Sequence, residues 1–234
     1  VVISATGLYR DHFPNAMKQL VEAVRLADEV LVIDSGSEDQ TVALAQALGA
    51  QVVIYADWQG FGVQRSRALQ HLREDGWVFF LDADERMTQP LAQEVRAVVE
   101  KNTEAVWEVE WEQMAYGQSL ARMSSKGGVT RLFPVRILQE FSGAVHEGAV
   151  LRRPAPSHRL RNRLPHFSRE TIYGSLLKLA QYVQLGALKR REAGKRGGVW
   201  RGLGSGVANF LRLYLFRRGF LCGRAGFLFC FFVG

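Results

Sequence analysis

The first hundred residues alternate between short apolar runs and segments with helical spacing. The apolar runs have the length of buried strands and cover residues 1–4, 29–33, 51–55 and 77–81. The intervening and following segments predict helices over residues 13–26, 38–48, 60–72 and 90–100. Strands separated by single helices predict βαβ units, a parallel sheet and right-handed crossovers.

Capping signals accompany two of these helices. Ser37 and Gln40 have the spacing of a capping box at the start of the helix over residues 38–48. Pro90 lies near the start of the helix over residues 90–100, where its missing N–H is not needed. We therefore expect Ser37 to cap its own helix.

The pattern changes after residue 100, where acidic and apolar residues begin to alternate. Helical spacing returns from Thr171 onward, with basic residues interleaved among the apolar ones. Between these regions the sequence predicts strands over 106–111 and 131–138, a loop over 116–128 and irregular structure over 152–168.

Charge divides the chain into an acidic and a basic part. Residues 1–151 carry 13 basic and 21 acidic side chains, a net charge of −8, whereas residues 152–234 carry 17 and 2, a net charge of +15. A chain of 234 residues can form one full core with a smaller appendage. We therefore predict an α/β domain over 1–151 and a basic, partly helical extension over 152–234, which suits a polyanionic partner.

Cysteine usage gives a weaker indication of compartment. The only two cysteines, Cys222 and Cys230, lie in the apolar tail and form no disulfide framework or Cys/His ligand pattern. A reducing cytoplasmic setting fits this usage.

Acidic residues directly follow the apolar run at 77–81. Asp82, Asp84 and Glu85 fall within four positions, and ionised carboxylates this close repel one another unless a cation lies among them. In open α/β sheets this edge is where ligands bind. The pattern predicts a site where Asp82 and Asp84 hold Mg²⁺ or Mn²⁺ against a diphosphate. A polar turn after a core strand is the alternative interpretation.

Two further acidic residues are candidates for the same site. Asp34 follows the apolar run at 29–33, so a parallel sheet would bring it to the edge where Asp82 lies; a helix cap is the alternative. Glu147 follows His146 further along the chain. The sequence contains neither Gly-x-x-x-x-Gly-Lys-[Ser/Thr] nor Gly-x-Gly-x-x-Gly, so a P-loop NTPase or a dinucleotide-binding fold is not supported.

These motifs, taken in chain order, resemble the inverting family 2 glycosyltransferases with a GT-A fold, in particular the lipopolysaccharide-core glucosyltransferases. The resemblance implies a Rossmann-like, mostly parallel sheet flanked by helices. It also implies transfer of a sugar from a nucleotide-sugar donor, UDP-glucose or similar, to a saccharide acceptor such as lipopolysaccharide core. The segments that carry it are residues 27–41, 58–65, 81–86, 131–133, 145–147 and 214–221.

The resemblance implies a role for each matched polar residue on the donor side. Asp34 would bind the nucleoside, and Arg65 would neutralise the diphosphate. Asp82 would contact the ribose or the metal-bound diphosphate, and Asp84 would bind the Mg²⁺ or Mn²⁺ directly.

On the acceptor side the resemblance implies that Glu147 is the general base for an acceptor hydroxyl. Arg131 would lie on the acceptor strand. His146 would serve the metal or the acceptor, with a structural histidine as the alternative.

The sequence also departs from the family pattern at two loops. Residues 7–10 read Gly-Leu-Tyr-Arg where the family usually has Lys-Asn-Glu after a threonine, so contacts of that loop with the base are expected to differ. Residues 126–130 replace an aromatic-Pro-Asp stretch, so the acceptor pocket is expected to differ as well.

Other proteins with an Asp-x-Asp motif fit less well. A haloacid-dehalogenase-type phosphatase has the motif on an N-terminal strand with Thr or Val two residues later, where this chain has Arg86. A sugar nucleotidyltransferase has a Gly-rich N-terminal loop, which is absent. A non-catalytic module that binds polyanions or membranes on a transferase-like scaffold is the remaining alternative, supported by the basic tail.

The tail combines aromatic and aliphatic residues with interleaved arginines over residues 210–233. Its longest uncharged apolar run, residues 225–233, is far shorter than the roughly 20 residues of a spanning helix. Such a pattern predicts a helix lying in the membrane interface, and a helix packed on the core is the alternative. Nucleic acid is not an expected partner, because no nucleic-acid motif accompanies the charge. We therefore expect peripheral attachment to the cytoplasmic face of the membrane.

Overall fold

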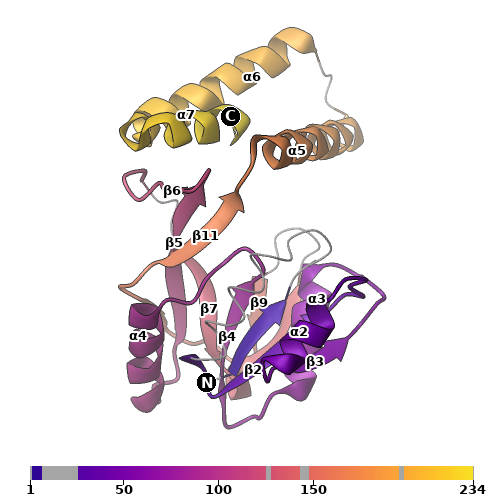
Figure 1. Ribbon diagram of the computed structural model, residues 1–234, viewed down its shortest axis with the longest axis vertical. Coiled ribbons are helices and arrows are strands. Elements are labelled where there is room, and N and C mark those ends of the chain that lie inside the picture. Colours follow the sequence, from indigo (N-terminus) through magenta and orange to yellow (C-terminus); the bar gives the residue numbers. More distant parts are fainter. Residues whose placement is uncertain (1, 7–25, 125–127, 143–147, 195–197, 234) are drawn as a thin grey trace. The chain divides into compact units, whose positions relative to one another are not determined.

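A computed structural model describes residues 2–6, 26–124, 128–142, 148–194 and 198–233 (Figure 1). The chain divides into two compact units, the first formed by residues 1–111 and 127–165 and the second by residues 112–126 and 166–234. The predicted boundary after residue 151 therefore differs from the one in the structure. Residues 152–165 belong to the first unit because they form part of its sheet.

The first four strands pair in parallel, as the alternation of apolar runs and helices predicts. Their order across the sheet is β3-β2-β1-β4, and their bounds are β1 Val2–Thr6, β2 Glu29–Asp34, β3 Gln51–Ile54 and β4 Trp77–Asp82. The sheet then continues with antiparallel neighbours, so it is mixed rather than mostly parallel. These are β7 Gly128–Pro134 beside β4 and β5 Val106–Ala115 beside β7, with β10 Ser157–Arg159 parallel to β5.

Alternate side chains of the buried strands fill two cores, one on each face of the sheet. Phe79 and Leu81 pack beneath α2 Thr41–Ala47 and α4 Gln89–Glu100. Val78 and Phe80 face the other way. They are covered by α3 Phe61–Ala68 and by the hairpin of β8 Leu138–Ser142 and β9 Gly148–Leu151. Because both faces are covered, β4 is apolar throughout and its polar residues begin only where it ends.

The predicted capping box at Ser37 is wrong. The Ser37 hydroxyl donates to Asp34, and α2 begins later, at Thr41, whose N–H donates to Asp39 Oδ1 at 2.9 Å. The Asp34 carboxylate competes for Ser37 because it lies within the same turn. Pro90 does lie in the first turn of α4, whose N-cap Thr88 accepts from the Leu91 N–H.

Three other local predictions also need correction. The stretch over 152–168, predicted as irregular, contains β10 and β11 Leu164–Arg169. Both strands pair with β5, a contact that their own Arg- and Pro-rich sequence does not reveal. The strand predicted over 131–138 ends at Pro134, and the predicted loop over 116–128 contains the short β6 Gln118–Ser119. The helix predicted over 13–26 lies outside the described residues except for its last residue.

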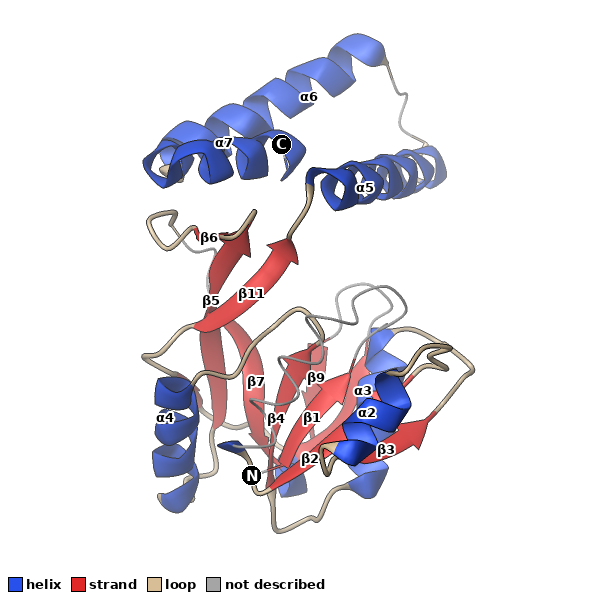
Figure 2. Cartoon of the chain, in the orientation of Figure 1, coloured by secondary structure: helices blue, strands red, loops and turns tan. Residues whose placement is uncertain are grey.

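The second unit is built mainly from helices (Figure 2). They are α5 Ile172–Glu192, α6 Val199–Leu211, a π-helical turn over Arg212–Phe216, a 3₁₀ turn over Gly219–Cys222 and α7 Gly223–Val233. Among the described residues, no helix is both long and apolar enough to cross a membrane.

Close packing of backbone on backbone holds the 3₁₀ turn against α7. A methyl group added at Gly226 would lie 2.1 Å from the carbonyl oxygen of Gly219, and one at Gly219 would lie 2.5 Å from Cys230 Sγ. The contact at Gly226 is with backbone and cannot be relieved without moving it, so this crossing requires glycine at position 226.

We predict that Gly226→Ala lowers the free energy of unfolding of the second unit by about 1–3 kcal/mol, the usual cost of overpacking. The matched control is Gly204→Ala in α6, where an added Cβ meets nothing within 4 Å. That change should be neutral or stabilise the helix by up to about 1 kcal/mol. Chemical denaturation with hydrogen exchange on α7 measures both, and equal stability of the two variants would contradict the packing argument.

Candidate functional site

The predicted acidic residues of the first unit meet at one edge of its sheet. Asp34 ends β2 and Asp82 ends β4, and β1 lies between these strands. The register aligns Ile33, Thr6 and Asp82 in one row, so Asp34 lies one residue beyond that row. Two strand spacings separate the strands of these residues, a distance of about 10 Å. The expectation that Asp34 and Asp82 leave the sheet at the same edge is confirmed.

A tight turn follows β4 and carries Asp84 at its tip. The turn is closed by a hydrogen bond from the Glu85 N–H to the Asp82 carbonyl oxygen at 3.0 Å. Glu85 Oε2 in turn accepts from the Asp82 N–H at 2.8 Å. The side chain of Glu85 is fully buried, so it fixes the strand end from inside the protein while Asp84 remains partly exposed.

Both carboxylate oxygens of Asp82 are bound by arginines. Asp82 Oδ1 lies 2.5 Å from Arg65 Nη2, and Oδ2 lies 2.5 Å from Arg131 Nη2. Arg131 also forms an ion pair with Glu85, whose Oε1 accepts from Trp111 Nε1 at 2.7 Å. We call Arg65, Asp82, Glu85 and Arg131 the carboxylate–guanidinium cluster.

Opposite charges keep Asp82 and Arg131 ionised within this cluster. Burial raises the pKa of Asp82, but the charges of Arg131 and Arg65 and their hydrogen bonds lower it further, so the pKa lies below its usual value. For Arg131, burial lowers the pKa, and the attraction of Asp82 and Glu85 outweighs that effect and raises it. The cations that the crowded carboxylates require are therefore supplied by the protein itself.

Asp34 is fully buried, and its carboxylate is engaged by its own turn. It accepts from the N–H groups of Gly36 and Ser37, each at 2.8 Å, and from the Ser37 hydroxyl. The next residue, Ser35, accepts from the buried Gln64 side chain at 2.8 Å, which ties the turn to α3. The carboxylate thus shapes the loop at this edge, and its contact with a nucleoside stays a prediction.

Arg131 does not present its guanidinium to solvent. Its side chain is only 2% exposed and lies between Asp82 and Glu85. The Cζ atom lies 6.0 Å from the centroid of the Trp111 ring. Direct contact of Arg131 with an acceptor stays a prediction, and the geometry itself supports a role in holding Asp82. His146 and Glu147 both lie outside the described residues.

The charges and donor atoms at this edge fit a divalent cation. Arg65 and Arg131 pair with Asp82 and Glu85, and Asp84 adds a further carboxylate in the same turn. Among the described residues, no group of three or more acidic, histidine or cysteine side chains gathers to enclose an ion. Mg²⁺ does not need such a cage, because it is usually held by one or two carboxylates together with phosphate oxygens and water. Asp84, with lone pairs left on Asp82, provides that donor set.

Sequence reasoning counted Glu85 among the crowded carboxylates but assigned it no role, and it missed the two other polar residues that build the site. Gln64 and Trp111 offered no comparable signal, because their partners lie 29 and 26 residues away in the sequence.

The fold and the site define an α/β protein whose acidic residues lie at the carboxyl edge of parallel strands, where arginines pair with them. The family model of glycosyl transferase family 2 matches residues 9–152 of the chain. The chain therefore belongs to this family, as its motifs predict.

Two curated relatives illustrate the match. The chain is 29% identical over 216 residues to lipopolysaccharide core biosynthesis glycosyltransferase LpsC of Rhizobium meliloti (strain 1021), covering 89% of this chain and 79% of that protein. It is 36% identical over 96 residues to an uncharacterised glycosyltransferase of Rickettsia conorii, covering 41% of this chain and only 33% of that protein.

Solved structures match over a smaller part of the chain. One is S. aureus TarS 1-349 in complex with UDP, with a TM-score of 0.41 and 17% identity over 58% of this chain and 47% of that one. Another is glucosyl-3-phosphoglycerate synthase from Mycobacterium tuberculosis in complex with Mg²⁺ and UDP, with a TM-score of 0.40 and 18% identity over 59% and 57%.

We predict that Arg131→Met lowers the free energy of unfolding of the first unit by about 3–5 kcal/mol, because it leaves the fully buried Glu85 without its cation and Asp82 with Arg65 alone. The matched control is Arg159→Met, which removes an arginine from ion pairs with Glu108 and Glu110 at the surface. That change should cost no more than about 1 kcal/mol. Urea denaturation compares the two variants, and similar losses would show that the cluster is no stronger than a surface pair.

Proposed function

We propose that this protein is an inverting, metal-dependent glycosyltransferase that transfers a sugar from a nucleotide-sugar donor to a saccharide acceptor. The observation that carries the proposal is the carboxylate–guanidinium cluster, with Asp84 beside it at the carboxyl edge of the sheet in a family 2 chain. A fold of this kind binds ligands at that edge.

On the donor side, we assign the metal to Asp84 and Asp82. A bound Mg²⁺ or Mn²⁺ would stabilise the negative charge on the departing nucleoside diphosphate. Arg65 adds positive charge beside Asp82, which suits a diphosphate. We assign UDP as the nucleotide. Asp34 and its turn form the neighbouring wall for the nucleoside. Through its hold on Asp82, Arg131 keeps the donor site in shape, and the acceptor contact first predicted for it is secondary.

On the acceptor side, we assign the general base to Glu147. Its carboxylate takes the proton of an acceptor hydroxyl as that oxygen attacks the anomeric carbon, opposite the departing diphosphate, so the configuration inverts. His146 stands next to it as a metal-side or acceptor residue. The relative LpsC is named for lipopolysaccharide core biosynthesis, which supports a core saccharide on a lipid as the acceptor. We assign glucose as the donor sugar, as the sequence motifs imply. Such an acceptor places the protein at the cytoplasmic face of the membrane.

We predict that Asp84→Ala abolishes sugar transfer and leaves the fold intact. The change removes a metal ligand but also relieves charge repulsion, so the metal-free variant should be as stable as the parent or slightly more stable. Release of nucleoside diphosphate from a panel of nucleotide sugars with Mn²⁺, together with thermal shift, measures both effects. Asp75→Ala, which removes an exposed aspartate paired with Arg73, is the matched control.

Near-normal turnover of the Asp84→Ala variant would remove the metal assignment. Absence of donor turnover in the parent protein with every nucleotide sugar and metal would instead favour the non-catalytic membrane- or polyanion-binding module.

We also predict that Glu147→Gln lowers kcat by roughly 10²–10⁴-fold, the usual contribution of a positioned general base, with little change in donor affinity. Glu140→Gln, at an exposed position of β8, is the control and should keep normal turnover. Steady-state kinetics with donor titration separates the two quantities. Weaker donor binding with unchanged kcat would move Glu147 from catalysis to the donor site.

A further inference from the structure

Helix α6 of the second unit presents a row of apolar side chains to solvent. Trp200 is 86% exposed and Val199 77% exposed, values that are unusual for large apolar residues. We call the exposed row the α6 stripe, and it consists of Val199, Trp200, Leu203, Val207 and Leu211.

The stripe follows helical geometry. After the adjacent Val199 and Trp200 its members recur at intervals of three and four residues, which places them along one side of the helix. The other side carries Arg201, Ser205 and Arg212, all of which are exposed. α6 is therefore an amphipathic helix whose apolar side is exposed along its first turns.

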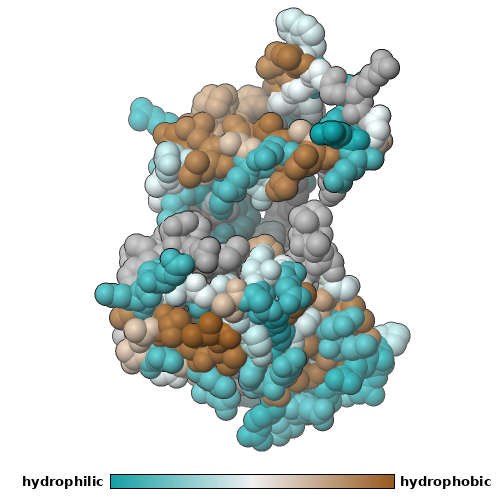
Figure 3. All heavy atoms as spheres, turned by 90° about the vertical axis from the view of Figure 1, so that its right-hand side faces the viewer, coloured by the Kyte–Doolittle hydropathy of each residue, from teal (hydrophilic) through white to brown (hydrophobic). Residues whose placement is uncertain are grey.

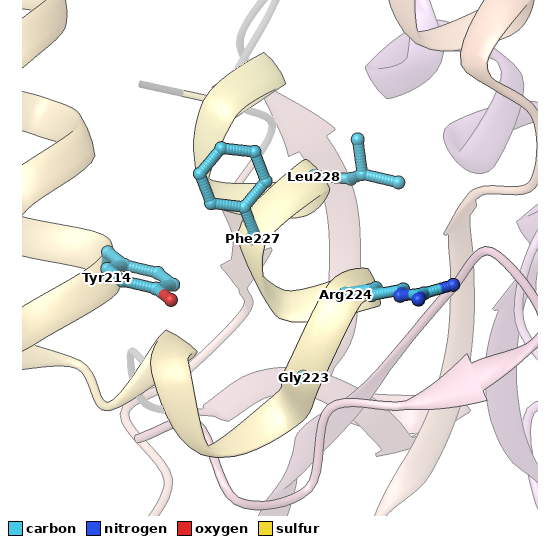
Figure 4. Close-up of a pocket in the computed structure, with 5 residues that line it drawn as sticks. All are labelled: Tyr214, Gly223, Arg224, Phe227 and Leu228. Carbon is cyan, nitrogen blue, oxygen red and sulfur yellow. The ribbon is translucent and has the colours of Figure 1, made fainter.

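The C-terminal end of the same side shows what it packs against. Phe210 lies 5.2 Å from Tyr214 and 5.7 Å from Phe227 of α7, measured between ring centroids. Tyr214 and Phe227 also line a pocket of about 380 Å³ with Gly223, Arg224 and Leu228 (Figure 4). In that view Arg224 points away from Tyr214. α6 thus continues beyond α7, and Figure 1 shows its N-terminal half projecting past that helix.

α7, by contrast, already has its apolar residues partly covered. Ala225, Gly226, Cys230 and Phe232 are buried within the unit. The tail over residues 210–233, first predicted to be the membrane contact, therefore includes much of the unit's internal packing. The tail also has exposed apolar residues, with Phe216 at 82%, and the α6 stripe overlaps it at Leu211.

The charge around the α6 stripe identifies the occupant. Residues 171–234 contain 11 basic side chains and one acidic side chain, a net charge of +10. Hydrophobic and hydrophilic side chains are interspersed over this unit (Figure 3). The surface of an anionic membrane has negative headgroups above an apolar acyl boundary. An apolar row with an exposed tryptophan in a strongly basic unit is complementary to both. The same basic helices of a second copy would bring a charge of the same sign against it.

We propose that the α6 stripe lies in the interface of an anionic membrane, with Trp200 at its leading end and Arg201 and Arg212 near the phosphates. This inference rests on the proposed function only in that a lipid-linked acceptor would lie at the membrane. Membrane binding by the α6 stripe needs no catalytic residue, so membrane binding and sugar transfer can be tested separately.

Flotation of the full chain with phosphatidylcholine vesicles that contain phosphatidylglycerol tests the proposal. Binding should require the anionic lipid and weaken with added salt. The double change Trp200→Ser with Leu203→Ser should lower partitioning at least about tenfold, because two large apolar contacts are lost. Ile54→Ser, at a similarly exposed apolar position of the first unit, should bind like the parent. Each of Arg201→Gln and Arg212→Gln should lower binding about fivefold.

Tryptophan fluorescence gives an independent readout. Anionic vesicles should shift the emission to shorter wavelength in the parent, and Trp200→Phe should lose most of that shift while still floating. Equal flotation of the serine double variant and the parent would overturn the proposal, as would full binding to pure phosphatidylcholine in high salt. A shift that depends on protein concentration without vesicles would assign the stripe to a second copy. Donor turnover measured without vesicles shows separately whether the proposed enzyme activity holds.

Discussion

The structure of the donor edge depends on one buried cation, the guanidinium of Arg131 between Asp82 and Glu85. β4 ends in carboxylates that could not be buried together without it. The next strand in the sheet, β7, supplies it: Leu132, the residue after Arg131, pairs with Phe79 of β4. The antiparallel pairing that forms the sheet therefore also assembles the site. A sheet without that strand would lack both the core contact and the counter-charge.

Much of the first unit could be predicted from local sequence because its strands are buried on both faces. A run such as 77–81 has no alternative environment, and its polar ending marks the edge of the sheet. The prediction of irregular structure over residues 152–168 was wrong for the opposite reason. Its strands carry few apolar residues and exist because β5 offers backbone partners far away in the sequence. The predicted capping box was wrong because the Ser37 hydroxyl donates to the Asp34 carboxylate and does not cap α2.

The acidic residues of the candidate site could be predicted from the sequence, whereas the pairing of Arg65 and Arg131 with Asp82 could not. Repulsion among Asp82, Asp84 and Glu85 correctly required a cation, and a metal was the natural hypothesis. Two of the cations come from the chain itself, 17 and 49 residues away from Asp82. Only the sheet order brings Arg131 there. The metal assigned under the proposed function would then lie beside an Asp82 that is paired with two arginines, with Asp84 as a second carboxylate in the same turn.

The second unit differs from the first in the side chains that it leaves exposed. The first unit buries charges and pairs them, whereas α6 leaves apolar side chains in water and carries Gly202, Gly204 and Gly206 within its length. Each glycine weakens an exposed helix by about 1 kcal/mol relative to alanine. A helix this weak gains most of its stability from burying an amphipathic face. Docking of the α6 stripe at a bilayer would supply that burial, so α6 should become more ordered where a lipid-linked acceptor is found than in bulk water.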